Sequence, residues 1–551
     1  MCDCLQLKLL SSLEKVFLDE DVNAETCPDI LSGLRGETVS FQAAFCLQKE
    51  WGRVPVKVEV ASPIQSCIHV RLVKSVPVEC AANAHADEHY LRLTPGLYPD
   101  LLRELPENGE IWPALRHWYS LWIDAELTKE IEPGTYPVSV TLTADDERRT
   151  ETVQIKVIGA DLPEQKLMHT EWMHADCLAD YYQVPVFSEA HWTIIEKFIR
   201  EAVKRGCNMM MVPLFTSPLD VGFGGSRTTT QLVRVSVEDG NYRFDFRDVR
   251  RWVELCQSCG IRYFEMSHLF SQWGAKYAPV IYADVDGKEK RIFGFDTPAV
   301  GEYTRFLKAF LPELTGKLRE WGIDQNTYFH ISDEPREEDL ETYAAARESL
   351  GDMLDGFHTF DALSSYEFYR HGLIDKPVPG NNEIQEFLDH GLKDMWTYYC
   401  TGQCVDVSNR FMAMPSYRNR IIGVQLYKFR IIGFLHWGFN FYNSQFSIEH
   451  INPYQVTDAG GAFPAGDPFL VYPGEDGNPE ESIRIMVFQE ALQDLRALEL
   501  LESLTDRSHV MELIENGLDQ PLSFTVYPHD PKYLLQLRKR VNEEIESLLN
   551  K

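Results

Sequence analysis

Hydrophobic and polar residues alternate with a period of two along several segments of the first 163 residues. Residues 138–143 and 152–157 show this alternation on either side of an acidic turn at 145–148. A strand that buries one face has this pattern, so the two segments predict a β-hairpin. Residues 56–60 and 121–124 repeat the pattern. Many short strands of this kind predict a β-sandwich domain over residues 1–163.

After residue 163 the pattern changes to short apolar strands that alternate with longer helical segments. Residues 303–321 are one such helix, because apolar side chains recur there every three or four positions. The expected strands begin near Met168, Asn208, Ile261, Thr327, Asp355, Lys376, Asp394 and Gly433. Eight strands with helices between them predict an α/β fold of the TIM (β/α)8 barrel type over residues 164–500. A charged helical segment, 501–551, is expected to follow.

Two adjacent carboxylates end the fourth predicted barrel strand. An apolar run from Thr327 leads into Asp333 and Glu334, and Pro335 stops the strand. Catalytic side chains of a TIM barrel project from the carboxyl ends of its strands. Neighbouring residues on a regular strand face opposite ways, so both carboxyls can share a site only where the strand turns outward. The alternative is that they cap the following helix.

The adjacency of Asp333 and Glu334 also bears on mechanism. A retaining glycosidase of the ordinary kind needs two carboxyls on opposite sides of the bond, roughly 5–5.5 Å apart. Neighbouring carboxyls fit a substrate-assisted reaction better, in which a 2-acetamido group of the sugar attacks the anomeric carbon. That reaction requires an acid/base, for which burial beside a second carboxyl would raise the pKa of Glu334, and a residue that orients the amide.

Aromatic side chains combine with polar ones at three other predicted strand ends, 267–274, 394–399 and 433–440. Sugar rings stack on aromatic side chains while their hydroxyls need polar partners, so these ends predict a sugar pocket. The alternative is that each aromatic residue packs against a loop. The candidate substrate-binding residues are Trp437, Tyr398, His268, Trp273, Asn208, His436 and Trp396, with Glu171 and His174 as further polar candidates.

Charge narrows the range of partners. The chain has 53 Lys and Arg residues against 84 Asp and Glu residues, a net charge of −31. This charge repels nucleic acid and anionic membrane surfaces but is compatible with a neutral substrate such as a sugar. No segment reaches the ~20 apolar residues of a membrane span, and no export signal is visible, so a cytoplasmic protein is expected. The sequence leaves a homo-oligomer open.

Three segments carry a resemblance to a known family. Residues 330–335 (HISDEP), 268–275 (HLFSQWGA) and 433–440 (GFLHWGFN) resemble glycoside hydrolase family 123. The resemblance implies a retaining, exo-acting β-N-acetylgalactosaminidase that forms an oxazoline-like intermediate and uses no metal or organic cofactor. Its partner would be a small glycan or glycoconjugate with a terminal β-N-acetylgalactosamine.

The same resemblance implies roles for four residues. Glu334 would protonate the glycosidic oxygen and then activate water, while Asp333 would hold the acetamido group. Tyr398 would donate a hydrogen bond to the acetamido oxygen, and Trp437 would form the floor under the sugar. Two alternatives stay open at this point: another β-hexosaminide such as N-acetylglucosamine, and a non-catalytic glycan-binding protein.

Overall fold

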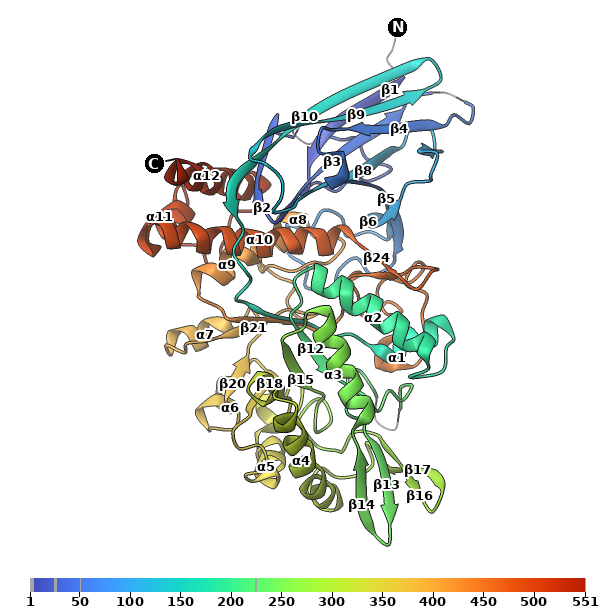
Figure 1. Cartoon of the computed structure of the whole chain (residues 1–551), viewed down its shortest axis with the longest axis vertical. Coiled ribbons are helices and arrows are strands. Elements are labelled where there is room, and N and C mark those ends of the chain that lie inside the picture. Colours follow the sequence, from blue (N-terminus) through green and yellow to red (C-terminus); the bar gives the residue numbers. More distant parts are fainter. Residues whose placement is uncertain (1–3, 24–26, 50, 223–224, 551) are drawn as a thin grey trace.

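The computed structural model describes residues 4–23, 27–49, 51–222 and 225–550. A two-sheet N-terminal region lies at one end of the molecule, a strand-and-helix barrel at the other, and the last helices lie beside the N-terminal sheets (Figure 1). The predicted order of sandwich, barrel and C-terminal helices is therefore confirmed as an architecture.

The N-terminal region is a sandwich of two five-stranded sheets. The first has the order β1 (Leu5–Ser11), β3 (Glu37–Leu47), β8 (Trp118–Leu127), β5 (Ile68–Val78) and β6 (Gly96–Glu104). The second has the order β2 (Ile30–Arg35), β10 (Glu147–Asp161), β9 (Gly134–Ala144), β4 (Val56–Ala61) and β7 (Glu110–Ile111). β9 and β10 form the predicted hairpin. The apolar side chains of the two sheets share one buried cluster, as alternating strands of a sandwich do.

Eight parallel strands form the barrel, and each begins within three residues of its predicted start. In spatial order they are β20 (Lys376–Val378), β19 (His358–Ala362), β18 (Thr327–Phe329), β15 (Tyr263–Met266), β12 (Met209–Val212), β11 (Met168–Glu171), β22 (Gly433–His436) and β21 (Trp396–Tyr398). A bridge between Gly380 and Tyr398 joins the two ends of the sheet. Because the strands are parallel, all their carboxyl ends meet on one face of the barrel.

Helices follow the barrel strands. They are α1 (Ala175–Tyr182), α2 (Glu189–Lys204), α3 (Arg247–Cys259), α4 (Glu302–Glu320), α5 (Leu340–Leu350), α6 (Glu367–Arg370), α7 (Ile384–Asp389), α8 (Ser416–Arg420), α9 (Ile422–Lys428) and α10 (Ile483–Leu504). In α4 the predicted apolar stripe is buried, including Tyr303, Phe306 and Phe310. Short 3-10 turns lie at Gln65–Cys67, Asp324–Asn326, Glu337–Asp339 and Gln445–Ser447.

A small mixed sheet lies outside the barrel and was not predicted. Its strands β13 (Arg234–Glu238) and β14 (Asn241–Asp245) follow β12, and β16 (Ile281–Val285) and β17 (Lys288–Phe293) follow β15. The two antiparallel hairpins are joined by the parallel pair β13 and β16. The two hairpins project together at the end of the molecule that is farthest from the sandwich (Figure 1). A separate pair, β23 (Tyr472–Pro473) and β24 (Pro479–Glu480), precedes α10.

The last helices are α11 (Arg507–Glu515) and α12 (Pro531–Leu549), and α12 contacts the sandwich. Lys156 Nζ of β10 lies 2.6 Å from Glu546 Oε2 of α12, and Arg538 of α12 pairs with Glu37 of β3. α10 also contacts both regions, since its Gln493 accepts a hydrogen bond of 2.7 Å from the backbone N–H of Thr38. The C-terminal segment therefore joins the sandwich to the barrel.

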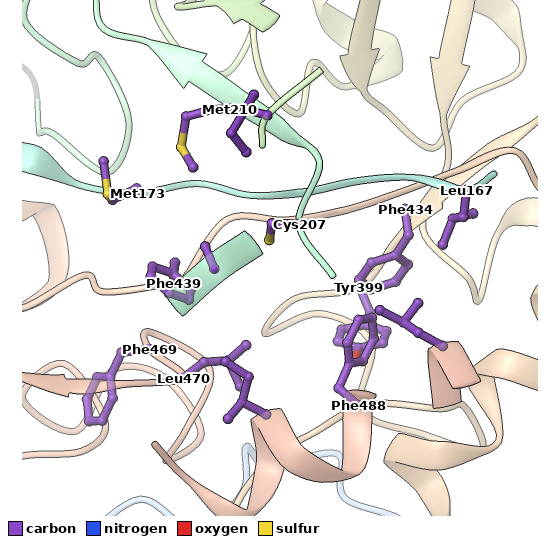
Figure 2. Packing of buried hydrophobic residues seen from close by; sticks show 14 of the residues in the cluster. Leu167, Met173, Cys207, Met210, Tyr399, Phe434, Phe439, Phe469, Leu470 and Phe488 are labelled. Carbon is purple, nitrogen blue, oxygen red and sulfur yellow. The ribbon is translucent and has the colours of Figure 1, made fainter. Parts of the chain in front are cut away.

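Apolar packing joins α10 to the barrel. Phe434 of β22 packs against Tyr399 with ring centroids 5.0 Å apart and against Phe488 of α10 with centroids 5.1 Å apart, and Figure 2 shows the three side chains close together. Aromatic pairs at such distances add to the stability that buried area provides. Within the described ranges, no helix combines the length and the apolar composition that crossing a membrane requires.

Candidate active site

Asp333 and Glu334 lie in the loop directly after β18, at the carboxyl face of the barrel. Glu334 has a left-handed backbone, with φ of 44°, and its N–H donates to the carbonyl oxygen of Ala362 over 2.9 Å. Non-glycine residues rarely adopt this conformation, which costs energy that the surrounding structure must supply. The turn it makes removes the alternation of a strand, and both carboxyls line one cavity.

Asp361, near the end of β19, holds the segment that leads into this turn. Its carboxyl oxygens accept the backbone N–H groups of Ile331 and Ser332 over 2.9 and 3.1 Å, and the hydroxyl of Tyr343 over 2.6 Å. The side chain is completely buried. A buried carboxylate with three donors fixes the backbone immediately before Asp333.

His330 lies between two buried carboxyls beneath the cavity. Its Nε2 is 2.9 Å from Glu265 Oε2, and its Nδ1 is 3.3 Å from Asp361 Oδ1. Burial alone would lower the pKa of His330, but the bonds to Asp361 and Glu265 raise it to about 9. The ring is therefore an imidazolium at neutral pH. Glu265 also accepts the indole N–H of Trp172 over 3.1 Å. The cluster of His330, Glu265 and Asp361 is therefore hydrogen-bonded to a residue of the cavity wall.

Opposing influences act on the pKa of Asp333. Burial and the adjacent charge of Glu334 raise the pKa of Asp333 well above its usual range, while the charge of His330 acts in the opposite direction. Gln272 donates its side-chain amide to Asp333 Oδ2 over 2.7 Å. A ligand group that donates a further hydrogen bond would favour the ionised form of Asp333.

Glu334 receives two donors on the same oxygen. The hydroxyl of Tyr398 donates to Oε1 over 2.8 Å, and the thiol of Cys400 donates to it over 3.6 Å. Burial, and then the charge of Glu334, raise the pKa of both donors well above their usual range, so both keep their protons. Among the described residues no donor contacts Oε2, which leaves that oxygen to exchange a proton with a ligand.

The cavity has a volume of about 140 Å³. Its walls are mostly apolar and aromatic, and Trp437 is fixed by an indole hydrogen bond of 3.0 Å to Asp467. The lining residues are Trp172, Leu219, Asp220, Gln272, Trp273, Asp333, Glu334, Ala362, Tyr398, Cys400, Thr401, Leu435, Trp437, Gln445 and Phe463. Such walls with a few polar groups suit a sugar ring.

Five of the sequence-predicted residues therefore come together: Asp333, Glu334, Tyr398, Trp437 and Trp273. Trp273 has φ of 57°, and its N–H donates to the carbonyl oxygen of Asp333 over 2.9 Å. Its ring is 36% exposed and packs edge-on against Phe446 at the mouth of the cavity.

Asn208 does not lie at this face, and its predicted position is wrong. It precedes β12, so it sits at the amino end of that strand. Its side chain accepts from the N–H of His169 over 2.8 Å and donates to the carbonyl oxygen of Leu167 over 2.9 Å. A residue at the amino end of a parallel strand cannot reach the carboxyl face, so Asn208 is a structural link between strands.

His268, Trp396 and His436 are also corrected, because none of them lines the cavity. His268 stacks on His330 with ring centroids 4.2 Å apart and is sealed from solvent. Trp396 points into the barrel interior, 5.4 Å from the ring of Phe360. His436 is buried, and its Nδ1 accepts the backbone N–H of Gly438 over 3.0 Å. These three side chains are buried in the protein interior and do not line the cavity.

The further polar candidates take supporting positions as well. Both carboxyl oxygens of Glu171 are bound by Arg410, over 2.7 and 2.8 Å. His174 bonds through Nε2 to the carbonyl oxygen of Trp437 over 2.8 Å. Burial, followed by the charge of Arg227, lowers the pKa of His174 to about 3, so its ring is neutral.

Sequence reasoning missed Trp172, Asp220 and Gln272. Trp172 follows β11 directly, so its strand-end position was the available signal. Gln272 belongs to the same segment as Trp273. Asp220 lies in the long loop between β12 and β13, where no local pattern marks it. In the described part of the chain, no group of three or more His, Cys, Asp or Glu side chains is arranged to hold a metal ion.

Solved structures give a full-length likeness. A family 123 glycoside hydrolase from Clostridium perfringens has a TM-score of 0.74 and 17% identity, with 99% of this chain and 98% of that chain covered. At this identity the likeness shows the fold, including the sandwich and the barrel. A β-glucuronidase from Parabacteroides merdae has a TM-score of 0.32 and 11% identity, over 88% of this chain and 51% of that chain. A score this low carries no argument.

Sequence comparisons are more specific. No curated protein sequence matches the chain. The model of the glycoside hydrolase 123 catalytic domain matches residues 172–501, a range that contains every residue lining the cavity. Since this match covers more than half of the chain, the chain belongs to glycoside hydrolase family 123.

Proposed function

We propose that the chain is a retaining exo-glycosidase that removes terminal β-linked N-acetylgalactosamine. The observation that carries this proposal is the pair Asp333 and Glu334, whose adjacent carboxyls line a single aromatic-walled cavity. One carboxyl has a free oxygen for proton transfer, and the other has a charge that a ligand's hydrogen bond would control. Substrate-assisted hydrolysis needs these two roles, an acid/base and a carboxyl that binds the acetamido group.

In the proposed first step, Glu334 gives its proton to the glycosidic oxygen while the acetamido carbonyl oxygen attacks the anomeric carbon. The bond from this carbon to the leaving oxygen breaks, and an oxazoline-type intermediate forms. Glu334 then takes a proton from water, whose oxygen attacks the same carbon and reopens the ring. Two displacements at one carbon restore the β configuration.

Asp333 would accept the N–H of the acetamido group and stabilise the positive charge that develops on it. Because the pKa of Asp333 is raised by burial and by Glu334, this N–H bond would shift the carboxyl toward its ionised form. Tyr398 would hold Glu334 through Oε1 and turn its hydroxyl to the acetamido oxygen when the substrate binds. Trp437, fixed by Asp467, would lie under the sugar ring.

The nature of the partner rests on analogy. The structural analysis of the Clostridium perfringens enzyme concerns glycolipid glycan hydrolysis. We accordingly propose a glycan or glycoconjugate with a terminal β-N-acetylgalactosamine as the substrate. We also propose a cytoplasmic location, since buried thiols such as Cys177, Cys207 and Cys256 suit a reducing compartment.

A second candidate mechanism follows from Asp220, a third carboxyl in the cavity lining. With Glu334 as the acid, Asp220 could act as the nucleophile of an ordinary two-carboxylate reaction. Such an enzyme would not need the acetamido group.

The test compares nitrophenyl N-acetyl-β-galactosaminide with nitrophenyl β-galactoside. We expect the acetamido substrate to be cleaved much faster, and equal or faster cleavage of the galactoside would eliminate substrate assistance. Glu334→Gln should lower kcat by about 10²- to 10⁴-fold, because it removes the transferable proton. The matched control is Glu151→Gln on an exposed position of β10, which should leave kcat unchanged. A wild-type protein that binds the sugar without turnover would instead be a glycan-binding protein.

A further inference from the structure

Asp220 is a built part of the cavity wall that the proposed reaction does not use. It has φ of 47°, and its N–H donates to Gln272 Oε1 over 2.8 Å. The N–H of Phe446 donates to Asp220 Oδ2 over 3.0 Å, and the hydroxyl of Ser447 donates to the Asp220 carbonyl oxygen over 2.8 Å. Loops after β12, β15 and β22 thus converge on this residue and fix its side chain.

Only one oxygen of this carboxyl is engaged. Among the described residues no donor is bonded to Oδ1, although the side chain is about nine-tenths buried and lines the cavity. An acceptor oxygen that no described protein donor contacts can accept a hydrogen bond from a ligand in the cavity. Burial raises the pKa of Asp220 to about 6, so the group is mostly ionised at neutral pH and accepts strongly.

The rest of the wall offers little else to a sugar. Of the described lining residues, the charged ones are Asp220, Asp333 and Glu334, and none is Lys, Arg or His. Thr401 donates its hydroxyl to Asp467, and Tyr398 donates its hydroxyl to Glu334. Of the described lining side chains outside the Asp333, Glu334 and Gln272 group, Asp220 and Gln445 are those with a carboxyl or amide oxygen that can accept from a hydroxyl. A charged acceptor is the stronger partner for a hydroxyl.

We propose that Asp220 is the specificity-determining residue that accepts a hydrogen bond from a ring or exocyclic hydroxyl of a neutral sugar in this cavity. This inference rests on the proposed function and adds the contact that distinguishes one sugar from another. It also defines an excluded class: a carboxylate or sulfate on the bound sugar meets three carboxyls and no basic group, so uronic acids and sulfated sugars are rejected.

The test uses Asp220→Asn, which keeps an oxygen for the N–H of Phe446 but removes the charge. Kinetics are measured on nitrophenyl N-acetyl-β-galactosaminide and on its 4-deoxy and 6-deoxy forms. We expect kcat/KM for the parent sugar to fall about 10- to 100-fold, mostly through KM, because a charged hydrogen bond is lost. The substrate that lacks the contacted hydroxyl should lose almost nothing further. Ser447→Ala, which disturbs the same loop but not the carboxyl, should affect all three substrates equally.

Two outcomes overturn the proposal; the first leaves the proposed function intact, and the second replaces substrate assistance with the two-carboxylate mechanism. One is an equal loss on all three substrates, which would make Asp220 a purely structural residue. The other is abolished turnover with a covalent sugar on the wild-type protein, which would make Asp220 the nucleophile.

A binding measurement keeps the test independent of turnover. Calorimetry with Glu334→Gln and free N-acetylgalactosamine, 4-deoxy and 6-deoxy sugars, with and without Asp220→Asn, should show the same non-additive pattern in Kd. If no neutral sugar binds, or Asp220→Asn weakens all of them alike, the proposal fails whether or not the protein is a hydrolase. If galacturonic acid bound as tightly as the neutral sugar, the inference that the cavity rejects acidic sugars would be wrong.

Discussion

In the sandwich, β9 and β10 pair without interruption from Ala144 and Glu147 to Gly134 and Val157, and their inward side chains are apolar and fully buried. At the mouth of the barrel, the buried side chains include an imidazolium and several carboxyls, and three lining residues have left-handed backbones: Asp220, Trp273 and Glu334. Buried apolar area stabilises the first region. The second retains conformations and charges that cost stability.

The difference shows where each region's sequence is constrained. A sandwich strand needs only the right alternation, so many sequences would serve. The barrel mouth needs particular side chains, because Asp361 must hold the backbone before Asp333, and His330 must neutralise Asp361 and Glu265. Costly local features persist at sites where the surrounding structure supports them, as they do in functional sites generally.

The largest effect is expected from His330→Leu, which removes the ion pairs of His330 with Glu265 and Asp361 below the cavity. Removing the imidazolium leaves Glu265 and Asp361 buried without their counterion, which should cost about 3–5 kcal/mol of unfolding free energy. The matched control is His268→Leu. Burial and the charge of His330 lower the pKa of His268 far below its usual range, and neither of its ring nitrogens has a partner among the described residues. That substitution should be close to neutral, as measured by urea denaturation.

The pH dependence of the same pair checks the cause. The pKa of His330 is raised to about 9 in the folded protein, against an ordinary value of 6.5. Its contribution to stability is therefore complete below pH 6.5 and is lost as pH rises through 9. His330→Leu should abolish this part of the pH dependence and His268→Leu should retain it. A stability profile that is the same in both variants would contradict the imidazolium.

A smaller effect, confined to activity, is expected from Asp333→Asn. The pKa of Asp333 is already raised by burial and by Glu334, so a neutral amide should keep or slightly increase the melting temperature. If Asp333 stabilises the charged amide in the transition state, kcat should fall about 10²- to 10³-fold. Steady-state kinetics and thermal unfolding of one preparation measure both quantities. An unchanged kcat would remove Asp333 from the reaction.

The sequence predicted most of the regular structure because that structure depends on local periodicity. The barrel strands are short apolar runs, and the β9–β10 hairpin alternates cleanly, so both were recognised. The β13–β14 hairpin was missed although Asp239 and Gly240, with φ of 50° and 77°, form the favoured two-residue turn between alternating strands. Its signal was present but was overlooked within a βα connection.

The site was predictable only where one motif carries it. Asp333 and Glu334 are adjacent in sequence, and family membership, which the motifs suggested, is confirmed. Trp396 and His436 show why the remainder failed. Trp396 is the first residue of β21, and His436 is the last residue of β22 but is buried, and the sequence does not say which residue of a strand reaches the mouth of the barrel. Asp220 depends on contacts with Gln272 and Phe446, from two distant loops, which no local pattern encodes.

The smallest effect is expected from Ile155→Val in the sandwich. This substitution tests whether a change in sandwich packing alters stability without altering activity. Ile155 is fully buried between the sheets, and losing one methyl group there should cost about 0.5–1.5 kcal/mol. Because none of the described residues that line the cavity belongs to the apolar cluster of Ile155, kcat and KM at 25 °C should match those of the wild type. Denaturant midpoints and initial rates provide the two readouts. A change in KM with unchanged stability would mean that the sandwich influences the sugar pocket directly. In that case the substitution would have altered the position of the sandwich relative to the barrel without weakening the fold.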